Sequence, residues 1–309
     1  MTDTVVALSE QSIRQGSKSF AAAARLFDRE TRDDCVMLYA WCRHCDDVID
    51  GQTLGHDQQR DFRVGQLERL DLLRRQTAEA LETGGATDPI FVALSRVAER
   101  RTIPALYPQQ LLRGFEMDVE ERTYETVEDT LDYGYHVAGV VGVMMAMIMG
   151  ARDAAVLDRA SDLGIAFQLT NIARDVIDDA GAGRVYLPAE LLHEQGIDKI
   201  DAEDKAQWPL LHAAALRLLD IAEPYYDSAR IGMSALPTRS AWAIGAARRV
   251  YRAIGEKLRR GGPSAWEQRV STRRREKLAL LVAGLGDAAV TRLPVDAPPR
   301  QGLYQRPVA

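Results

Sequence analysis

Apolar side chains recur every three or four residues along most of the chain, which is the spacing of helices that bury one face. Ala and Leu are abundant and aromatic residues make up only 6%, which also favours helices over strands. Helices are predicted over residues 13–25, 32–50, 58–81, 91–101, 109–122, 126–149, 156–179, 210–230, 239–259 and 273–285. Because no block has the pattern of strands, we expect one all-α domain over residues 1–285.

Glycine and proline separate the predicted helices. Residues 83–87 form a turn before Asp88 and Pro89, which have the identities of a helix N-cap and a first helical residue. Residues 180–186 (AGAGRVY) are a glycine-rich loop. Residues 286–309 contain four prolines, and we expect them to form a disordered or loosely docked tail.

The longest apolar run, residues 137–151, is too short to span a bilayer comfortably and contains three glycines. We interpret it as a buried core helix. The N-terminal residues lack the basic and apolar regions of a signal peptide, so a cytoplasmic protein is expected.

Charge and cysteine content narrow the classes of function. The formal net charge is −6, whereas a general nucleic-acid binder is usually basic, so no nucleic-acid partner is expected. The chain has three cysteines, an odd number that fits a reducing compartment better than a disulfide framework. Cys42 and Cys45 form a CxxC beside His44, but no second cysteine pair exists to complete a zinc site. We interpret the thiols as structural.

A first acidic cluster lies at the end of the predicted helix over residues 32–50. At about 100° per residue, one narrow face of this helix carries Tyr39, Arg43, Asp46 and Asp50. Carboxylates one turn apart repel each other unless a cation lies between them, and their oxygens suit Mg²⁺. Arg43 could bind an anion at the same place. A solvated acidic helix end would explain the pattern of this cluster about equally well.

A second polar stripe runs along an otherwise apolar helix. Its members share one helix face: Gln168, Asn171, Asp175 and Asp179. Polar groups on an apolar helix are costly to bury without partners, so the stripe indicates a lined cavity or a metal site. Two such helices facing each other would hold metal ions that a diphosphate bridges. The metals would neutralise the leaving diphosphate, and an allylic C–O bond could then break to a carbocation.

With these motifs, the chain resembles the isoprenyl diphosphate synthases of the squalene and phytoene synthase type. The resemblance covers about residues 16–277. It rests on GSKSF at 16–20, LYAWCRHCDDVID at 38–50, YGYHVAGVVG at 133–142, QLTNIARDVIDD at 168–179 and RVYLP at 184–188. It implies an all-α, single-domain bundle of the isoprenoid-synthase type around a central cavity.

The resemblance also implies roles for individual residues. The metal ligands would be Asp46, Asp50, Asn171, Asp175 and Asp179. Tyr39 and Arg43 would act with the four aspartates in catalysis. The diphosphate would contact Ser17, Ser19, Tyr39, Arg43, Arg174, Tyr186, Tyr251 and Arg269, and the prenyl chain would contact Phe20, Tyr133, Val137 and Gln168. As a hypothesis from the flexibility of thioethers, Met145 also faces the prenyl chain.

The implied reaction condenses two geranylgeranyl diphosphates head to head, through prephytoene diphosphate, to phytoene in carotenoid biosynthesis. Several Mg²⁺ or Mn²⁺ ions would be required, and no NADPH is expected because the chain lacks a G-x-G-x-x-G motif after a strand. Lipid substrates are compatible with a peripheral membrane contact or with contacts to downstream carotenoid enzymes.

Three alternatives stay open at this point. A squalene or dehydrosqualene synthase would use farnesyl diphosphate and show the same motifs. The DDVID sequence at 46–50 also fits the DDxxD motif of head-to-tail elongation enzymes and terpene cyclases. A non-catalytic assembly factor is the third, although both acidic pairs are intact here.

Overall fold

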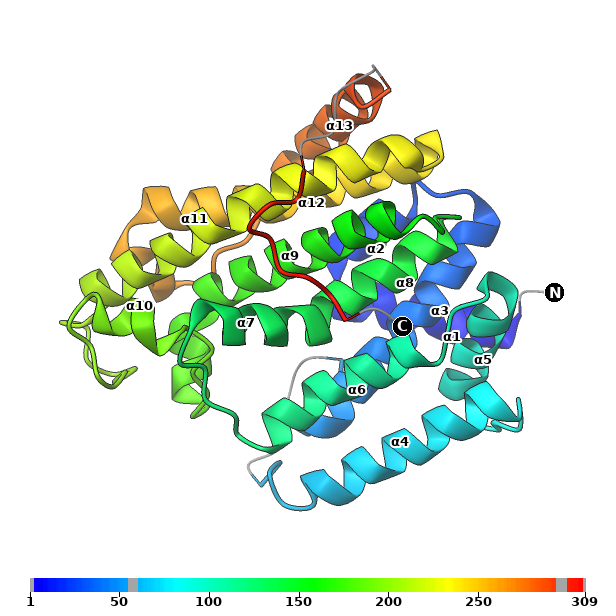
Figure 1. Ribbon diagram of the computed structural model, residues 1–309, viewed down its shortest axis with the longest axis horizontal. Helices are drawn as coiled ribbons and strands as arrows, with labels where there is room; N and C mark the ends of the chain where they lie inside the picture. The colour runs from blue at the N-terminus through cyan, green and yellow to red at the C-terminus, as the bar shows by residue number, and fades with distance from the viewer. Residues whose placement is uncertain (1–2, 55–60, 293–298, 308–309) are drawn as a thin grey trace.

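The structure is a computed structural model that describes residues 3–54, 61–292 and 299–307, without the side chains of Lys18 and Ser19 (Figure 1). The described residues form helices and no strand. The α-helices are α1 (Thr4–Gly16), α2 (Lys18–Ala24), α3 (Arg29–Asp50), α4 (Gln66–Glu82), α5 (Pro89–Arg101), α6 (Leu106–Val119), α7 (Val127–Gly134), α8 (Val140–Ile148), α9 (Ala154–Gly181), α10 (Ala189–His193), α11 (Trp208–Gly232), α12 (Thr238–Gly261) and α13 (Arg274–Val290). The shorter elements are a π-helix, η1 (Tyr135–Gly139), and the 3₁₀ helices η2 (Met233–Ala235) and η3 (Pro263–Glu267).

The long helix α9 lies in the middle of the bundle. It packs against α11 and α12 on one side and against α7, η1 and α8 on the other (Figure 1). Helices α3 and α6 complete the bundle beyond α8, and α4 and α5 lie at its outer edge. The predicted all-α fold is confirmed.

Two glycines let η1 and α8 approach α9 closely. A Cβ added to Gly164 would meet the carbonyl oxygen of Ala138, and one added to Gly142 would meet that of Ala160. Since close-packed interiors tolerate little added volume, these positions have no room for a side chain. The contact brings the η1–α8 wall next to the polar stripe of α9.

Three predicted helices differ from the structure by more than their end residues. The helix predicted over 13–25 is two helices, because α1 begins at Thr4 and Ser17 separates it from α2. Ser17 has extended backbone, and its hydroxyl accepts a hydrogen bond from the backbone nitrogen of Phe20 (3.3 Å). The helix predicted over 58–81 begins at Gln66, although residues 55–60 lie outside the described residues. The helix predicted over 126–149 is interrupted by η1.

The apolar segment Val127–Ile148 has the length and hydropathy of a membrane span, but 67% of its most apolar window is buried inside the bundle. Tyr135, Val140 and Met144 have no exposed surface. The segment is therefore packed as the core helix that the sequence predicted.

The C-terminal segment is docked where the structure describes it. Helix α13 continues to Val290, past the boundary expected at residue 285. Arg300 donates two hydrogen bonds to the buried Asp162 on α9 (2.6 and 2.8 Å), and the hydroxyl of Tyr304 donates to Asp132 on α7 (2.8 Å). Of the two states expected for the tail, disordered or loosely docked, residues 299–307 are docked, because ion pairs to α9 hold this segment across the bundle (Figure 1).

Candidate active site

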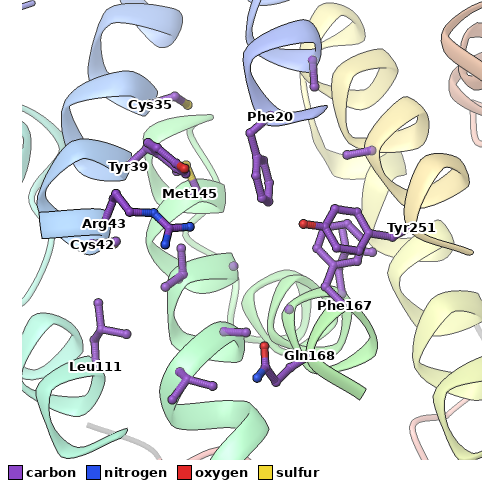
Figure 2. A pocket seen from close by; sticks show the side chains of 18 of the residues that line it. Phe20, Cys35, Tyr39, Cys42, Arg43, Leu111, Met145, Phe167, Gln168 and Tyr251 are labelled. Atoms are coloured by element: carbon purple, nitrogen blue, oxygen red, sulfur yellow. The ribbon is translucent and has the colours of Figure 1, made fainter. Parts of the chain in front are cut away.

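A cavity of about 330 Å³ is lined by residues of α1, α2, α3, α6, α7, η1, α8, α9 and α12. Successive turns of α3 present Cys35, Tyr39, Arg43 and Asp46 to it, so its wall changes from apolar to charged along this helix (Figure 2). On the opposite wall, Phe167 and Gln168 of α9 and Tyr251 of α12 point inward (Figure 2). An apolar chamber with one charged end can hold an amphipathic ligand with its charged group fixed.

The first acidic cluster lies at the charged end. Arg43 donates a hydrogen bond to Asp46 (2.5 Å). Loss of hydration, together with the charge of Asp50, raises the pKa of Asp46 to about 7 against the opposing charge of Arg43. A nearby cation would lower the pKa of a carboxyl group in such a place, because the cation favours the ionised form.

The second acidic cluster is held by arginines. Arg269 donates to Asp175 (3.0 Å), which Arg174 also contacts. Burial opposes ionisation of Asp175, but the hydrogen bonds and charges of these two arginines outweigh it and lower the pKa. For Asp179, loss of hydration and the charge of Asp175 raise the pKa to about 8.

Arg184 connects the two clusters. Its guanidinium donates to Asp50 (2.7 Å), its backbone nitrogen donates to the carbonyl oxygen of Asp179 (2.9 Å), and its charge opposes the raised pKa of Asp179. Asp46 from α3 and Asn171 from α9 line the same cavity. The polar groups of the two helices therefore converge at one end of the cavity, as the sequence predicted.

The donor set at this end fits a hard divalent cation. Four carboxylates and an amide supply only oxygen ligands, which is the preference of Mg²⁺ and Mn²⁺. The buried amide oxygen of Asn171 has no hydrogen-bond partner among the described residues. Within those residues no three acidic, histidine or cysteine side chains already surround one point, since arginines pair with the carboxylates instead.

Two polar residues of the site were missed by the sequence analysis. Asp118 on α6 accepts hydrogen bonds from the hydroxyl groups of Tyr186 (2.8 Å) and Tyr133 (3.2 Å), and burial raises its pKa to about 6 despite the charge of Arg184. The second is Arg184 itself. An indication for Asp118 was available, because it follows Phe115 by three positions on the face of α6 that is otherwise apolar.

Aromatic rings form much of the wall. Tyr251 stacks on Phe167 with ring centroids 4.0 Å apart, and Phe20 lies 5.9 Å from Tyr251. Tyr133 stacks on Tyr186 at 4.9 Å. The faces of aromatic rings attract cations, so a carbocation in this chamber would find favourable partners that are not nucleophilic.

The structure places most of the predicted residues in or beside the cavity. Those that line it are Phe20, Tyr39, Arg43, Asp46, Tyr133, Val137, Gln168, Asn171 and Tyr251. Those that adjoin its charged end through the pairs described above are Asp50, Arg174, Asp175, Asp179, Tyr186 and Arg269. The hydroxyl of Ser17 caps α2, and the side chain of Ser19 lies outside the description.

Comparison with known proteins identifies the family. Residues 13–276 match the family described as squalene/phytoene synthase. The chain belongs to this family. The 15-cis-phytoene synthase of Paracoccus sp. (strain N81106 / MBIC 01143) is 54% identical, with 99% of each chain covered. That of Enterobacter agglomerans is 52% identical, over 95% of this chain and 99% of the relative.

Solved structures of the same family share the fold. A dehydrosqualene synthase in complex with a ligand is 27% identical and superposes with a TM-score of 0.80, covering 93% of this chain and 97% of the other. The squalene synthase HpnC from Alicyclobacillus acidocaldarius is 25% identical, with a TM-score of 0.73 over 84% and 94% of the two chains. The predicted family and the bundle fold are both confirmed.

Proposed function

We propose that the protein condenses two molecules of geranylgeranyl diphosphate head to head, through prephytoene diphosphate, to phytoene in carotenoid biosynthesis. The chain is a prenyltransferase of the phytoene synthase type. Relatives that are 50–54% identical over nearly its whole length carry that name. The observation that carries the proposal is the convergence of carboxylates from α3 and α9 at the charged end of an apolar cavity.

At the charged end, this chain's own residues would bind and orient the diphosphates. Arg43, Arg174 and Arg269 each pair with an aspartate and can turn to phosphate oxygens when a substrate enters. Bound Mg²⁺ or Mn²⁺, held by the five predicted ligands, would neutralise the departing diphosphate.

Along the apolar part, the wall would direct the carbocation. Phe20, Phe167 and Tyr251 present aromatic rings to the cavity, and these stabilise positive charge without reacting with it. The surrounding apolar side chains exclude water, which would otherwise trap the cation as an alcohol. Holding both prenyl chains side by side supplies the orientation that joining their first carbons requires.

The reaction can be tested with one substrate at a time. With geranylgeranyl diphosphate and Mg²⁺ but no NADPH, we expect a phosphate-free C40 hydrocarbon and released diphosphate. A C30 product formed faster from farnesyl diphosphate would indicate a dehydrosqualene synthase. A C20 hydrocarbon would indicate a cyclase, a requirement for isopentenyl diphosphate would indicate an elongation enzyme, and no diphosphate release would indicate an assembly factor.

The choice of metal and the cellular location belong to the same proposal. Oxygen donors accept both Mg²⁺ and Mn²⁺, so titration of each ion into the chelator-treated enzyme is the direct comparison. We place the protein in the cytoplasm with a peripheral contact to the membrane, because its substrates and product are lipids. Fractionation of cells that express it would test this location.

A further inference from the structure

Helix α13 carries an uncovered apolar stripe. Leu278, Val282 and Leu285 are 64%, 64% and 45% exposed, although large aliphatic side chains are usually buried. At about 100° per residue, these three and Ala289 fall within about 60° of one another on the helix. Figure 1 shows α13 at the edge of the molecule, with α12 on its inner side.

The opposite face of α13 is packed tightly against α12. A Cβ added to Gly284 would lie 2.6 Å from the backbone nitrogen of Ala246, and the indole nitrogen of Trp242 donates to the carbonyl oxygen of Leu281 (2.7 Å). Helix α13 is thus apolar on two faces, and only one has a partner among the described residues. A helix that is apolar on both faces is expected to be covered on both.

The charges on α13 are divided between the two faces. Its acidic side chains point to α12, where Glu276 pairs with Lys257 (2.6 Å) and Asp287 with Arg249 (2.6 Å). Arg273, Arg274 and Arg275 are exposed at the start of the helix. Arg274 and Arg275 both lie within about 60° of Leu278, so the outer stripe begins with cations and contains no acid.

We infer that the outer face of α13 docks onto the surface of a bilayer that contains anionic phospholipids. Aliphatic side chains next to a cluster of arginines are the combination that interfacial helices use, with the apolar groups entering the acyl boundary and the cations meeting the headgroups. A second copy of the chain fits less well, because the same face of its α13 offers no acid to neutralise the arginines.

If the proposed function holds, docking through α13 would bring the catalytic cavity close to the bilayer. Ala243, Ile244 and Ala247 of α12 line the catalytic cavity, while Gly245 and Ala246 of the same helix contact α13. Docking through α13 therefore places α12 between the cavity and the bilayer. Only α12 would then separate a water-insoluble hydrocarbon formed in the cavity from the apolar interior of the bilayer.

Flotation of the full-length protein with vesicles tests the surface without any substrate. The wild type is expected to float with phosphatidylcholine vesicles that contain phosphatidylglycerol, and less with phosphatidylcholine alone or at high salt. Leu278→Glu with Val282→Glu should lower the bound fraction about tenfold. Arg274→Gln with Arg275→Gln should lower it about tenfold on anionic vesicles and leave weak binding to neutral vesicles unchanged.

The matched control is Leu67→Glu, which changes a leucine that is 63% exposed on α4, at the opposite edge of the molecule (Figure 1). It should float like the wild type. All variants should keep wild-type helicity and wild-type turnover of detergent-dispersed substrate. If the wild type and all variants lack turnover, this would contradict the proposed function and would leave the membrane contact to be decided by flotation.

Three results would overturn the inference. The first is a wild type that does not float, and the second is a control that loses as much binding as the α13 variants. The third is a wild-type dimer by light scattering that becomes a monomer in Leu278→Glu with Val282→Glu, since the stripe would then be covered by a second copy.

Discussion

At the scale of single residues, the site depends on carboxylates that share a small, poorly hydrated volume. Their spacing on two helices could be predicted from the sequence, because helix geometry alone places residues i and i+4 on one face. The contacts of Asp118 with Tyr133 and Tyr186 were not readable, since they join α6, α7 and the loop after α9. Only the folded chain brings these distant segments together.

Replacement of one carboxylate by its amide tests the metal assignment. Asp46→Asn or Asp175→Asn should lower kcat/KM by about 10³-fold, because the amide keeps the shape and removes the charge that holds the cation. Helicity by circular dichroism should not change. The control Asp71→Asn alters an exposed aspartate on α4 and should be fully active. Full activity in either site variant would contradict the assignment.

The raised pKa values predict how metal and pH act together on stability. In the metal-free protein, Asp46 and Asp179 keep protons up to about pH 7 and 8, whereas the unfolded chain releases them near pH 4. The folded state therefore binds more protons in this window, and the contribution of both groups to stability falls as pH rises through it.

Mg²⁺ should reverse this loss, because it binds the ionised carboxyl groups and competes with protons. The increase in Tm on adding Mg²⁺ is expected to be small near pH 5 and largest near pH 8. Asp179→Asn should reduce the increase at the higher pH. An increase that is equal at all pH values would show that these carboxyl groups are not the binding site.

At the scale of elements, the sequence predicted most helices and failed where local geometry departs from a regular helix. Ser17 can occupy a helix interior, and its extended backbone and capping hydrogen bond in the structure show that α1 ends before it. The π-helix η1 has the same apolar composition as the α-helices on either side, so periodicity could not reveal it. The approach of Gly142 and Gly164 to a neighbouring backbone depends on how two helices pack against each other. The sequence of either helix alone does not predict it.

The close packing of η1 against α9 can be tested by adding one carbon atom. Gly164→Ala should destabilise the protein by about 2–4 kcal/mol, because the new Cβ would overlap the backbone of Ala138 and force the helices apart. Gly286→Ala on α13 is the matched control, since nothing lies within 4 Å of its added Cβ. That change should stabilise by about 0.5–1 kcal/mol. Urea unfolding measures both, and equal effects would argue against the close approach.

At the scale of the whole molecule, the cavity decides which prenyl chains fit. Its volume of about 330 Å³ depends on side chains from nine elements, so no segment of the sequence predicts it. The hypothesis that Met145 faces the substrate is consistent with its place in the cavity wall, while Met144 is fully buried in the core.

Enlarging Met145 should shorten the product. Met145→Trp fills part of the chamber, so in competition the yield from C20 diphosphate should fall relative to that from C15 diphosphate by about tenfold or more. Chromatography of the hydrocarbons measures the ratio. Leu210→Trp, at an exposed position of α11, should leave it unchanged. An unchanged ratio in Met145→Trp would remove this residue from the list of chain-length determinants.

The π-helix makes the number of residues in this wall as important as their identities. Between α7 and α8 it accommodates one residue more than a continuous α-helix would. Deleting Ala138 with loss of the π-helix would leave the later positions in nearly the same orientation, whereas a further inserted residue that the π-helix does not absorb would turn every later position by about 100°. After such an insertion, Val141 and Met145 would rotate out of the chamber, and Gly142 would no longer meet α9. An insertion in α8 should therefore be more damaging than deletion of Ala138.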